Sequence, residues 1–209
     1  MLKRVEANLL IAVRHGSTVM NAPEGERSRG WLPIPLDKSG MQGMADTADS
    51  LSDVEGIHGI YTSDLVRAVQ SAHEIARVHG MEIQPTHQLR DWNLGDFAGQ
   101  PIKQILPATH ALIDHPEQPA PNGESYNDFL NRTIPFLKQL VESPHTNVAV
   151  VHNRITTLLH AMSMTGGQEP HVPTLKQKGP VEPSGLMIMD PSWNVKYLHK
   201  PTLPDETVQ

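Results

Sequence analysis

Two histidines that end apolar runs are the first residues of this sequence whose types and spacing could do chemistry. Arg14 and His15 follow the run "LLIAV" at 9–13, and His152 follows "NVAVV" at 147–151. A neutral histidine can attack phosphorus, and an arginine presents a planar fork that matches phosphate oxygens. The residue types therefore indicate phosphoryl transfer without a metal, provided that the fold brings the two histidines together.

The composition narrows the classes of protein that this chain can be. It has 209 residues, 38% of them hydrophobic, which suits a single domain over 1–209 with a buried core. A net charge of −6 argues against nonspecific nucleic-acid binding. The absence of Cys excludes disulfides, thiolate metal sites and a Cys nucleophile. The N-terminal apolar run is too short for a signal peptide or a membrane span, so we expect a cytoplasmic protein without a membrane partner.

Strand-like and helix-like segments alternate along the chain. Continuous apolar runs predict buried strands, as at 8–13, and apolar residues at helical spacing predict helices, as at 38–51. Ser63 or Asp64 can cap a helix that Gly80 ends. The other expected elements are strands at 59–62, 81–85 and 147–151, helices at 65–79, 101–115, 125–141 (distorted or divided by Pro135) and 155–164, an antiparallel pair near 185–199, an exposed loop at 116–123 and a tail at about 200–209.

This order predicts an α/β fold, in which a mostly parallel sheet with antiparallel edge strands lies between two layers of helices. Ligands of such sheets bind beyond the carboxyl ends of the strands. Three polar segments directly follow predicted strands, at 14–15, 63–67 and 152–154. These segments should meet at that edge of the sheet. They bring two histidines and several arginines together, for which a bound phosphoryl group is the natural counter-ion.

Six sequence blocks resemble those of the histidine phosphatase superfamily, the phosphoglycerate mutase-like group. They occur in the family's order and span residues 8 to about 160. The blocks are "RHGSTVMN" (14–21), "RGWLPIPLDKSG" (29–40), "YTSDLVRAVQSA" (61–72), "LRDWNLGDFAGQ" (89–100), "NGESYNDFLNR" (122–132) and "VAVVHNR" (148–154).

The resemblance implies a role for each matching residue. His15 would be the nucleophile that becomes phosphohistidine, and Arg14, Arg67 and His152 would hold the phosphoryl oxygens. Asp91 matches the family's acid/base, which is usually a Glu, and would protonate the leaving oxygen and later activate water. The further phosphate- or substrate-binding positions would be Gly16, where the backbone approaches the ligand, Asn21, Gly30, Asn153 and Arg154.

Two departures from the family pattern leave alternatives open. Asp91 is one carbon shorter than the usual Glu, and Asp96 in the same block could serve instead. The late strand is followed by Asn153, where the family commonly has Gly, so a side chain narrows the pocket. Arg154 could add a cation for a doubly anionic substrate.

Three functions fit these residues. Hydrolysis of a small phosphomonoester is favoured over mutase-type transfer, because 100–122 contains only Lys103 as a cation and lacks the Arg pair with which the mutases grip a carboxylate. The third reading is a non-catalytic module that binds phosphate or a phosphopeptide. The resemblance implies no cofactor, the remaining histidines lack metal-ligand spacing, and the pair near 185–199 could join two sheets in a homodimer.

Overall fold

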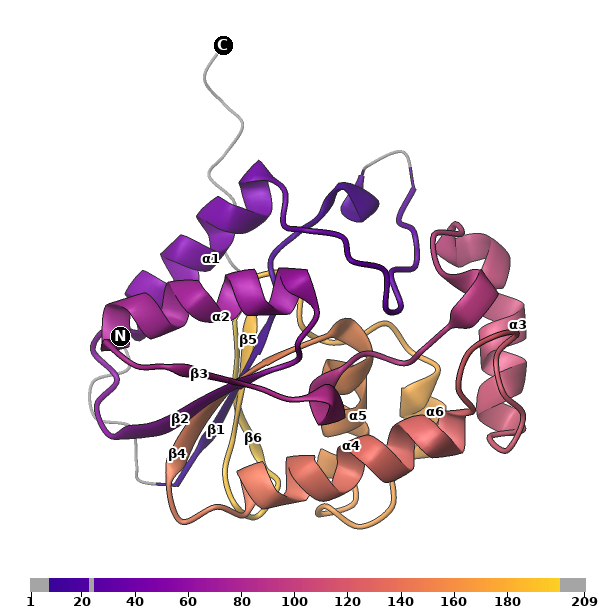
Figure 1. Cartoon of the computed structure of the whole chain (residues 1–209). Coiled ribbons are helices and arrows are strands. Elements are labelled where there is room, and N and C mark those ends of the chain that lie inside the picture. Colours follow the sequence, from indigo (N-terminus) through magenta and orange to yellow (C-terminus); the bar gives the residue numbers. More distant parts are fainter. Residues whose placement is uncertain (1–7, 23–24, 200–209) are drawn as a thin grey trace.

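A six-stranded mixed sheet forms the centre of the computed structural model, which describes residues 8–22 and 25–199 (Figure 1). The strand order is β3-β2-β4-β1-β5-β6. Strands β1, β2, β3 and β4 run parallel, while β5 and β6 add antiparallel pairs at one side. The strands are β1 Leu10–Arg14, β2 Ile57–Thr62, β3 Ile83–Pro85, β4 Thr146–Val151, β5 Leu186–Met189 and β6 Val195–His199. The predicted fold class is confirmed.

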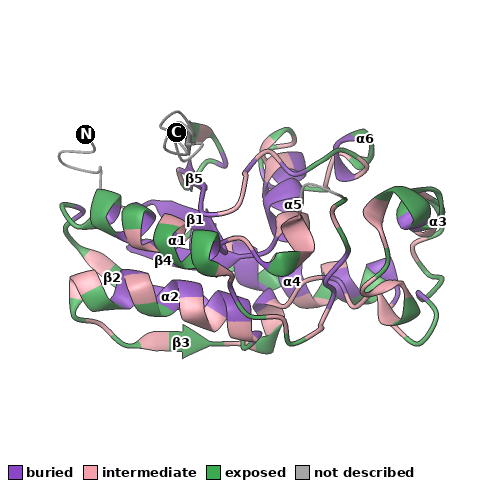
Figure 2. Cartoon of the chain, turned by 90° about the horizontal axis from the view of Figure 1, so that it is seen from above, coloured by how far each residue is buried: buried purple, intermediate pink, exposed green. Residues whose placement is uncertain are grey.

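Helices cover both faces of the sheet (Figure 1). On one face lie α1 (Lys38–Leu51) and α2 (Val66–His79); on the other lie α4 (Tyr126–Val141), α5 (Asn153–Ser163) and the short α6 (Val172–Leu175). Alternation along β1 separates two cores, because Ile11 and Val13 pack with α1 and α2 whereas Leu10 and Ala12 pack with α4 and α5. The ribbons of these helices accordingly alternate between buried and exposed positions in Figure 2.

Helix α3 (Ile102–Asp114) lies to the side of these layers and is exposed over much of its surface (Figures 1 and 2). Three single 3-10 turns, η1 (Val19–Asn21), η2 (His87–Leu89) and η3 (Gly95–Phe97), lie in loops beyond the carboxyl ends of the strands. The connection at 116–123 is exposed except for a few positions such as Ala120. The expected tail at about 200–209 lies outside the described residues.

Helix α4 is not divided at Pro135, which was one of the two outcomes expected from the sequence. The helix is continuous, with Pro135 inside it. It begins with a capping box between Ser125 and Asp128, and it buries an apolar face that includes Phe129 and Leu137. Packing of that face against the sheet offsets the hydrogen bond that a proline removes from a helix.

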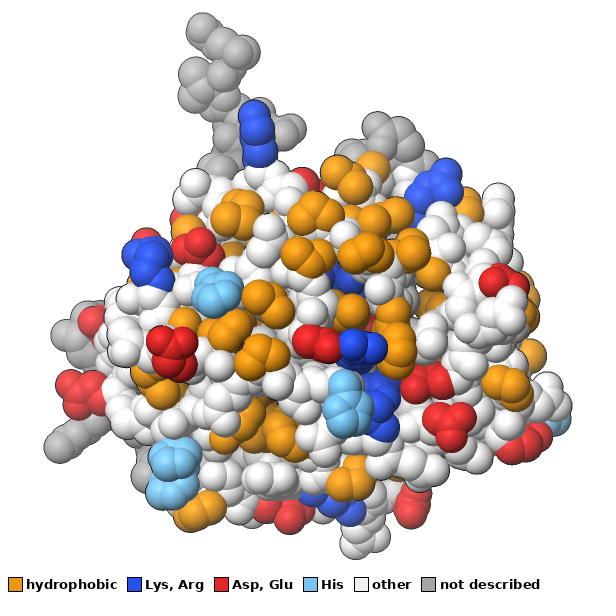
Figure 3. All heavy atoms as spheres, viewed as in Figure 1, with side chains coloured by type: hydrophobic (Ala, Val, Ile, Leu, Met, Phe, Trp, Pro, Cys, Tyr) orange, Lys and Arg blue, Asp and Glu red, His pale blue; other side chains and the backbone are white. Residues whose placement is uncertain are grey.

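Charged side chains of both signs are intermixed on the face that Figure 3 shows, and hydrophobic side chains gather over its upper part. None of the helices in the described part of the chain is long and apolar enough to cross a membrane.

Candidate active site

His15 lies at the carboxyl end of β1, and its side chain is 1% exposed. Its Nδ1 is 2.8 Å from the carbonyl oxygen of Gly16. Because a carbonyl can only accept a hydrogen bond, Nδ1 carries the proton and donates it. The tautomer is thereby fixed, and Nε2 keeps the lone pair that a nucleophile requires.

His152 directly follows β4, the parallel neighbour of β1, and lies next to the first histidine. The two imidazole centroids are 5.0 Å apart. The Nε2 atom of His152 is 2.8 Å from the Oγ of Ser63. Ser63 was expected to cap α2, but the N-cap is Leu65 and no side chain caps this helix. The serine instead fixes the orientation of the His152 ring, a role that the sequence analysis missed.

Two arginines flank the histidines and are buried almost completely. The Nη1 of Arg14 donates to the carbonyl oxygen of Val181 at 2.8 Å. Arg67 donates from Nη1 to Leu32 O at 3.0 Å and from Nη2 to Gly30 O at 2.8 Å. Burial lowers the pKa of each guanidinium to about 10, so both remain charged at neutral pH.

A third buried arginine, Arg29, was given no role from the sequence. It is 6% exposed, and its Nη2 donates to Oε1 of Glu26 at 3.1 Å. The same carboxylate oxygen lies 3.7 Å from Nη2 of Arg14 and accepts from Nδ2 of Asn21 at 3.1 Å. Arg29 opens the quoted block at 29–40, but an arginine in a loop gives no sequence signal of burial.

Several buried polar atoms of these side chains have no hydrogen-bond partner among the described residues. An unpaired buried donor costs about 1–3 kcal/mol, so native structures seldom gather several in one place. The clustering is what a site for an anion with several oxygens would produce. The donors are Nε of Arg14, Nη1 of Arg29, Nε of Arg67 and Nδ1 of His152; Oδ1 of Asn153 is also unpaired, but it is an acceptor and cannot bind an anion. We call His15, His152, Arg14, Arg29 and Arg67 the phosphoryl site.

Asp91 lies in the loop that follows η2 and lines a pocket next to the phosphoryl site. Its Oδ1 accepts from the backbone N of Trp92 at 3.0 Å. The alternative residue, Asp96, is exposed, does not line this pocket, and accepts from Nδ2 of Asn122 at 2.9 Å. The geometry therefore favours Asp91 over Asp96 as the acid.

Arg132 on α4 holds the loop that carries Asp91. Its Nη2 donates to the carbonyl oxygen of Asp91 at 3.2 Å and to Oε1 of Glu124 at 2.7 Å. The same Glu124 oxygen accepts from the backbone N of Asn93 at 2.8 Å. Nη1 of Arg132 lies within 3.2 Å of three further carbonyl oxygens of this loop, those of His87, Gln88 and Arg90. Arg132 therefore fixes the loop backbone at and before Asp91, and its partner Glu124 fixes the backbone after Asp91.

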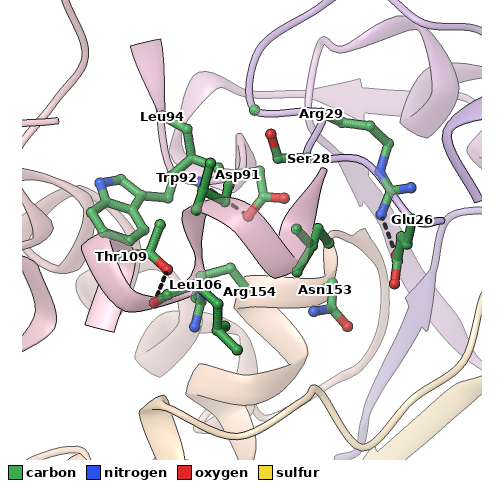
Figure 4. A pocket seen from close by; sticks show the side chains of 13 residues that line it. Glu26, Ser28, Arg29, Asp91, Trp92, Leu94, Leu106, Thr109, Asn153 and Arg154 are labelled. Atoms are coloured by element: carbon green, nitrogen blue, oxygen red, sulfur yellow. Dashed lines mark hydrogen bonds and ion pairs between the residues drawn. The ribbon is translucent and has the colours of Figure 1, made fainter. Parts of the chain in front are cut away.

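The pocket extends from the phosphoryl site to α3 (Figure 4). The pair formed by Arg29 and Glu26 lies at one end, and Trp92 lies at the other. Asn153 and Arg154, at the start of α5, both line it, and that they bind substrate stays a prediction. Arg154 also donates from Nη1 to the carbonyl oxygen of Leu175 at 2.8 Å, and its guanidinium carbon lies 5.8 Å from the Trp92 ring centroid.

The two predicted glycine positions serve the site through the backbone. A Cβ on Gly16 would lie 2.5 Å from the carbonyl oxygen of Gly40, so close packing against α1 is what requires glycine there. Gly30 has a φ of 46° and lines the pocket, and its carbonyl oxygen holds Arg67.

The chain can now be compared with known proteins. The profile of the histidine phosphatase superfamily, branch 1, matches residues 10–198. The chain belongs to the histidine phosphatase superfamily. Among curated relatives, phosphoglycerate mutase-like protein 4 of Arabidopsis thaliana is 36% identical over 138 residues, which cover 63% of this chain and 59% of the relative.

Other relatives of this histidine phosphatase superfamily member carry different names. A glucosyl-3-phosphoglycerate phosphatase of Mycolicibacterium vanbaalenii is 29% identical over 136 residues, covering 63% of this chain and 59% of that protein. The match therefore spans about three fifths of the length of these two relatives. Among solved structures, a mycobacterial glucosyl-3-phosphoglycerate phosphatase in complex with VO3 superposes with a TM-score of 0.72 at 25% identity, covering 88% of this chain and 93% of that one.

The two histidines of the phosphoryl site, His15 and His152, are held in the neutral form. Burial lowers the pKa of His15 well below its ordinary value of 6.5, and the positive charges of neighbouring groups lower it further. Burial and the nearby arginines also lower the pKa of His152. Neutral imidazole is the form that can attack phosphorus, and the arginines, whose charges favour a bound anion, also help to keep His15 unprotonated.

These pKa shifts predict a loss of stability on acidification. The unfolded chain takes up protons at both histidines below about pH 6.5, while the folded chain does not. The unfolding free energy therefore decreases as the pH is lowered below 6.5, by at most about 1.4 kcal/mol per pH unit for each histidine. Urea unfolding between pH 7.5 and 5, in a buffer without phosphate, measures this slope.

A matched pair of variants isolates the contribution of the nucleophile to this slope. His15→Asn should reduce the pH dependence, whereas His73→Asn, at an exposed position of α2, should leave it unchanged. Equal slopes for the two variants would contradict the assignment of the pH dependence to His15.

Proposed function

We propose that this chain is a metal-independent phosphatase that hydrolyses a phosphomonoester through a phosphohistidine intermediate. The observation that supports it best is the state of His15, which is buried, held by the carbonyl of Gly16 in the tautomer that leaves Nε2 free, and surrounded by three guanidinium groups. This combination of a neutral nucleophile and fixed positive charge suits attack on a phosphoryl group.

In the first step, Nε2 of His15 attacks phosphorus and the bond from phosphorus to the ester oxygen breaks. Asp91, in its protonated form, gives its proton to the departing oxygen. The charge that develops on the phosphoryl oxygens is stabilised by Arg14 and Arg67, which carbonyl oxygens hold in place before substrate arrives. His152 supplies a further hydrogen bond from the imidazole that Ser63 orients.

In the second step, water attacks the phosphohistidine. The Asp91 carboxylate takes a proton from this water, the bond from phosphorus to Nε2 breaks, and inorganic phosphate leaves. The acid is thereby protonated again for the next turnover, and His15 returns to its neutral form.

Hydrolysis is supported over mutase-type transfer by the side of the pocket that α3 forms. A mutase has to hold the carboxylate of its substrate through repeated transfers, which requires cations beside the phosphoryl site. Lys103, the cation that the sequence places between 100 and 122, is exposed and does not line the pocket, so beside the phosphoryl site Arg154 stands singly among the described residues where the mutases have an Arg pair. The curated relatives named above include both a phosphatase and a mutase-like protein, so the choice depends on this chain's own residues.

Turnover of p-nitrophenyl phosphate in the presence of EDTA tests the proposal. We expect release of nitrophenol and of an equal amount of inorganic phosphate, with no need for a bisphosphate primer. Phosphoenzyme trapped by acid-free denaturation should be stable in alkali and labile in acid, as phosphohistidine is. Dependence on 2,3-bisphosphoglycerate with little net phosphate release would instead indicate a mutase, and tight phosphate binding without any turnover would indicate a binding module.

A further inference from the structure

The pocket beside Asp91 has an apolar wall that the proposed mechanism does not use. Helix α3 contributes Ile102, Ile105, Leu106 and Thr109, which we call the α3 wall. These positions have the spacing i, i+3, i+4 and i+7, so they lie on one face of the helix. That face is turned toward the pocket, and three of its four side chains are branched aliphatic groups.

The opposite side of the pocket continues this surface. Trp92 and Leu94, from the loop that carries Asp91, also line it. In Figure 4, Trp92 and Thr109 lie close together at one end of the pocket, with Leu106 nearby. Leu106 is 41% exposed in the absence of a bound molecule, which is unusual for a leucine that lines a concave surface. A bound group placed between α3 and Trp92 would cover it.

The arginines of the pocket are engaged with other groups, and Arg154 lies near Leu106 of the α3 wall (Figure 4). Arg29 is paired with Glu26 at the far end. Arg154 lies over the Trp92 ring and donates to the carbonyl oxygen of Leu175. An anionic group on the leaving side of a substrate would lie against aliphatic side chains, where a charge loses hydration. The neighbouring cation, Arg154, is already held by the carbonyl oxygen of Leu175 and the Trp92 ring.

We propose that the substrate is a phosphomonoester of an uncharged, largely apolar alcohol, either aryl or branched alkyl. This inference rests on the proposed phosphatase function. The phosphoryl group binds among Arg14, Arg67 and His15, the ester oxygen faces Asp91, and the apolar body lies between the α3 wall and Trp92. The leaving group is thus selected by burial of apolar surface rather than by a second ion pair.

Three aryl phosphates with similar leaving groups test the inference. Phenyl phosphate, 4-isopropylphenyl phosphate and 4-carboxyphenyl phosphate differ in the apolar size or the charge of one substituent. We expect kcat/KM to be highest for the isopropyl compound and at least about tenfold lower for the carboxylate compound, since a methylene or two in an apolar pocket is worth at least that factor. Equal or faster hydrolysis of the carboxylate compound overturns the inference.

A lysine introduced on α3, either inside or outside the pocket, provides a matched pair of variants. Leu106→Lys adds a cation to the α3 wall at a partly exposed position, and it should reverse the preference toward the carboxylate compound. Ala108→Lys adds the same charge to the same helix at an exposed position outside the pocket, and it should not change the preference. Inhibition by vanadate, which reports on the phosphoryl site, should be the same in both variants and in the unsubstituted chain.

A binding measurement separates this inference from the proposed function. Benzylphosphonate and 4-carboxybenzylphosphonate cannot be hydrolysed, so calorimetry with them measures the preference of the pocket without turnover. Tighter binding of benzylphosphonate supports the apolar leaving group even if no phosphate is released from any ester, a result that would refute only the phosphatase function. Tighter binding of the carboxylate compound overturns the inference whether or not the chain turns over.

Discussion

His15→Ala abolishes phosphate release from every phosphomonoester. The substitution removes the nitrogen that forms the covalent bond to phosphorus. In the other imidazole of the phosphoryl site, His152, Nε2 is bonded to Ser63, and in the proposed mechanism Nδ1 serves as the hydrogen-bond donor to the phosphoryl group. Loss of a nucleophile typically lowers kcat by about 10⁴-fold or more. Release of nitrophenol from p-nitrophenyl phosphate measures the effect, and incorporation of radiolabelled phosphate into the protein shows whether an intermediate still forms.

The control for this experiment is another histidine replaced in the same way. His73→Ala alters an exposed position on α2 and should keep full activity. Inorganic phosphate should still bind to His15→Ala, because the arginines of the site are held by backbone carbonyls and not by the nucleophile. Residual activity within about tenfold of the unsubstituted chain would rule out a phosphohistidine mechanism at this residue.

Asp91→Asn should slow phosphorylation of the enzyme by an amount that depends on the leaving group. A phenolate or alkoxide needs a proton as it departs, so loss of the acid should cost about 10²–10⁴-fold with phenyl phosphate. Nitrophenolate is a stable anion that leaves without help, so p-nitrophenyl phosphate should still give a burst of one equivalent. The later attack by water also needs Asp91, and phosphoenzyme should therefore accumulate after the burst.

Rapid-mixing measurements with the two substrates distinguish this role from a general loss of structure. Misfolding would lower the burst rate equally for both esters, whereas loss of a proton donor affects the poorer leaving group selectively. Asp96→Asn is the matched control and should change neither rate, because Asp96 is exposed and bonded to Asn122. The opposite pattern in the two variants would assign the acid role to Asp96.

The main features of the fold could be predicted because they depend on local patterns. Continuous apolar runs identified β1 and β4, which are buried along their whole length, and Gly80 at a φ of 61° ends α2 as expected. That the polar segments at 14–15, 63–67 and 152–154 converge followed from the rule that the carboxyl ends of parallel strands lie at the same edge of a sheet. Division of α4 at Pro135 did not occur because the free-energy cost of a proline inside a helix is outweighed by the packing of α4. That packing involves residues far apart in the sequence, so a short stretch of sequence does not reveal it.

The site was predictable only where a residue followed a strand or matched a family block. The role of Ser63 escaped prediction because its partner, His152, belongs to a distant segment. The role of Arg29 escaped because its pair with the nearby Glu26 looks like any loop ion pair in the sequence, and only the fold shows that Arg29 is buried. The α3 wall shows the same limit. Its spacing is that of any amphipathic helix, and only the tertiary structure shows that its apolar face is turned toward a pocket and not toward the sheet.

The contacts of Arg132 have a consequence for protein engineering. Because this α4 side chain binds the carbonyl oxygens around Asp91, the shape of the acid-bearing loop is encoded about forty residues away from the loop itself. The side chains of the loop can then vary without moving its backbone, since the bonds are made to the main chain. A graft that imports this loop from a relative should therefore transfer the acid in register if Arg132 and Glu124 are kept, and should lose it if either is exchanged.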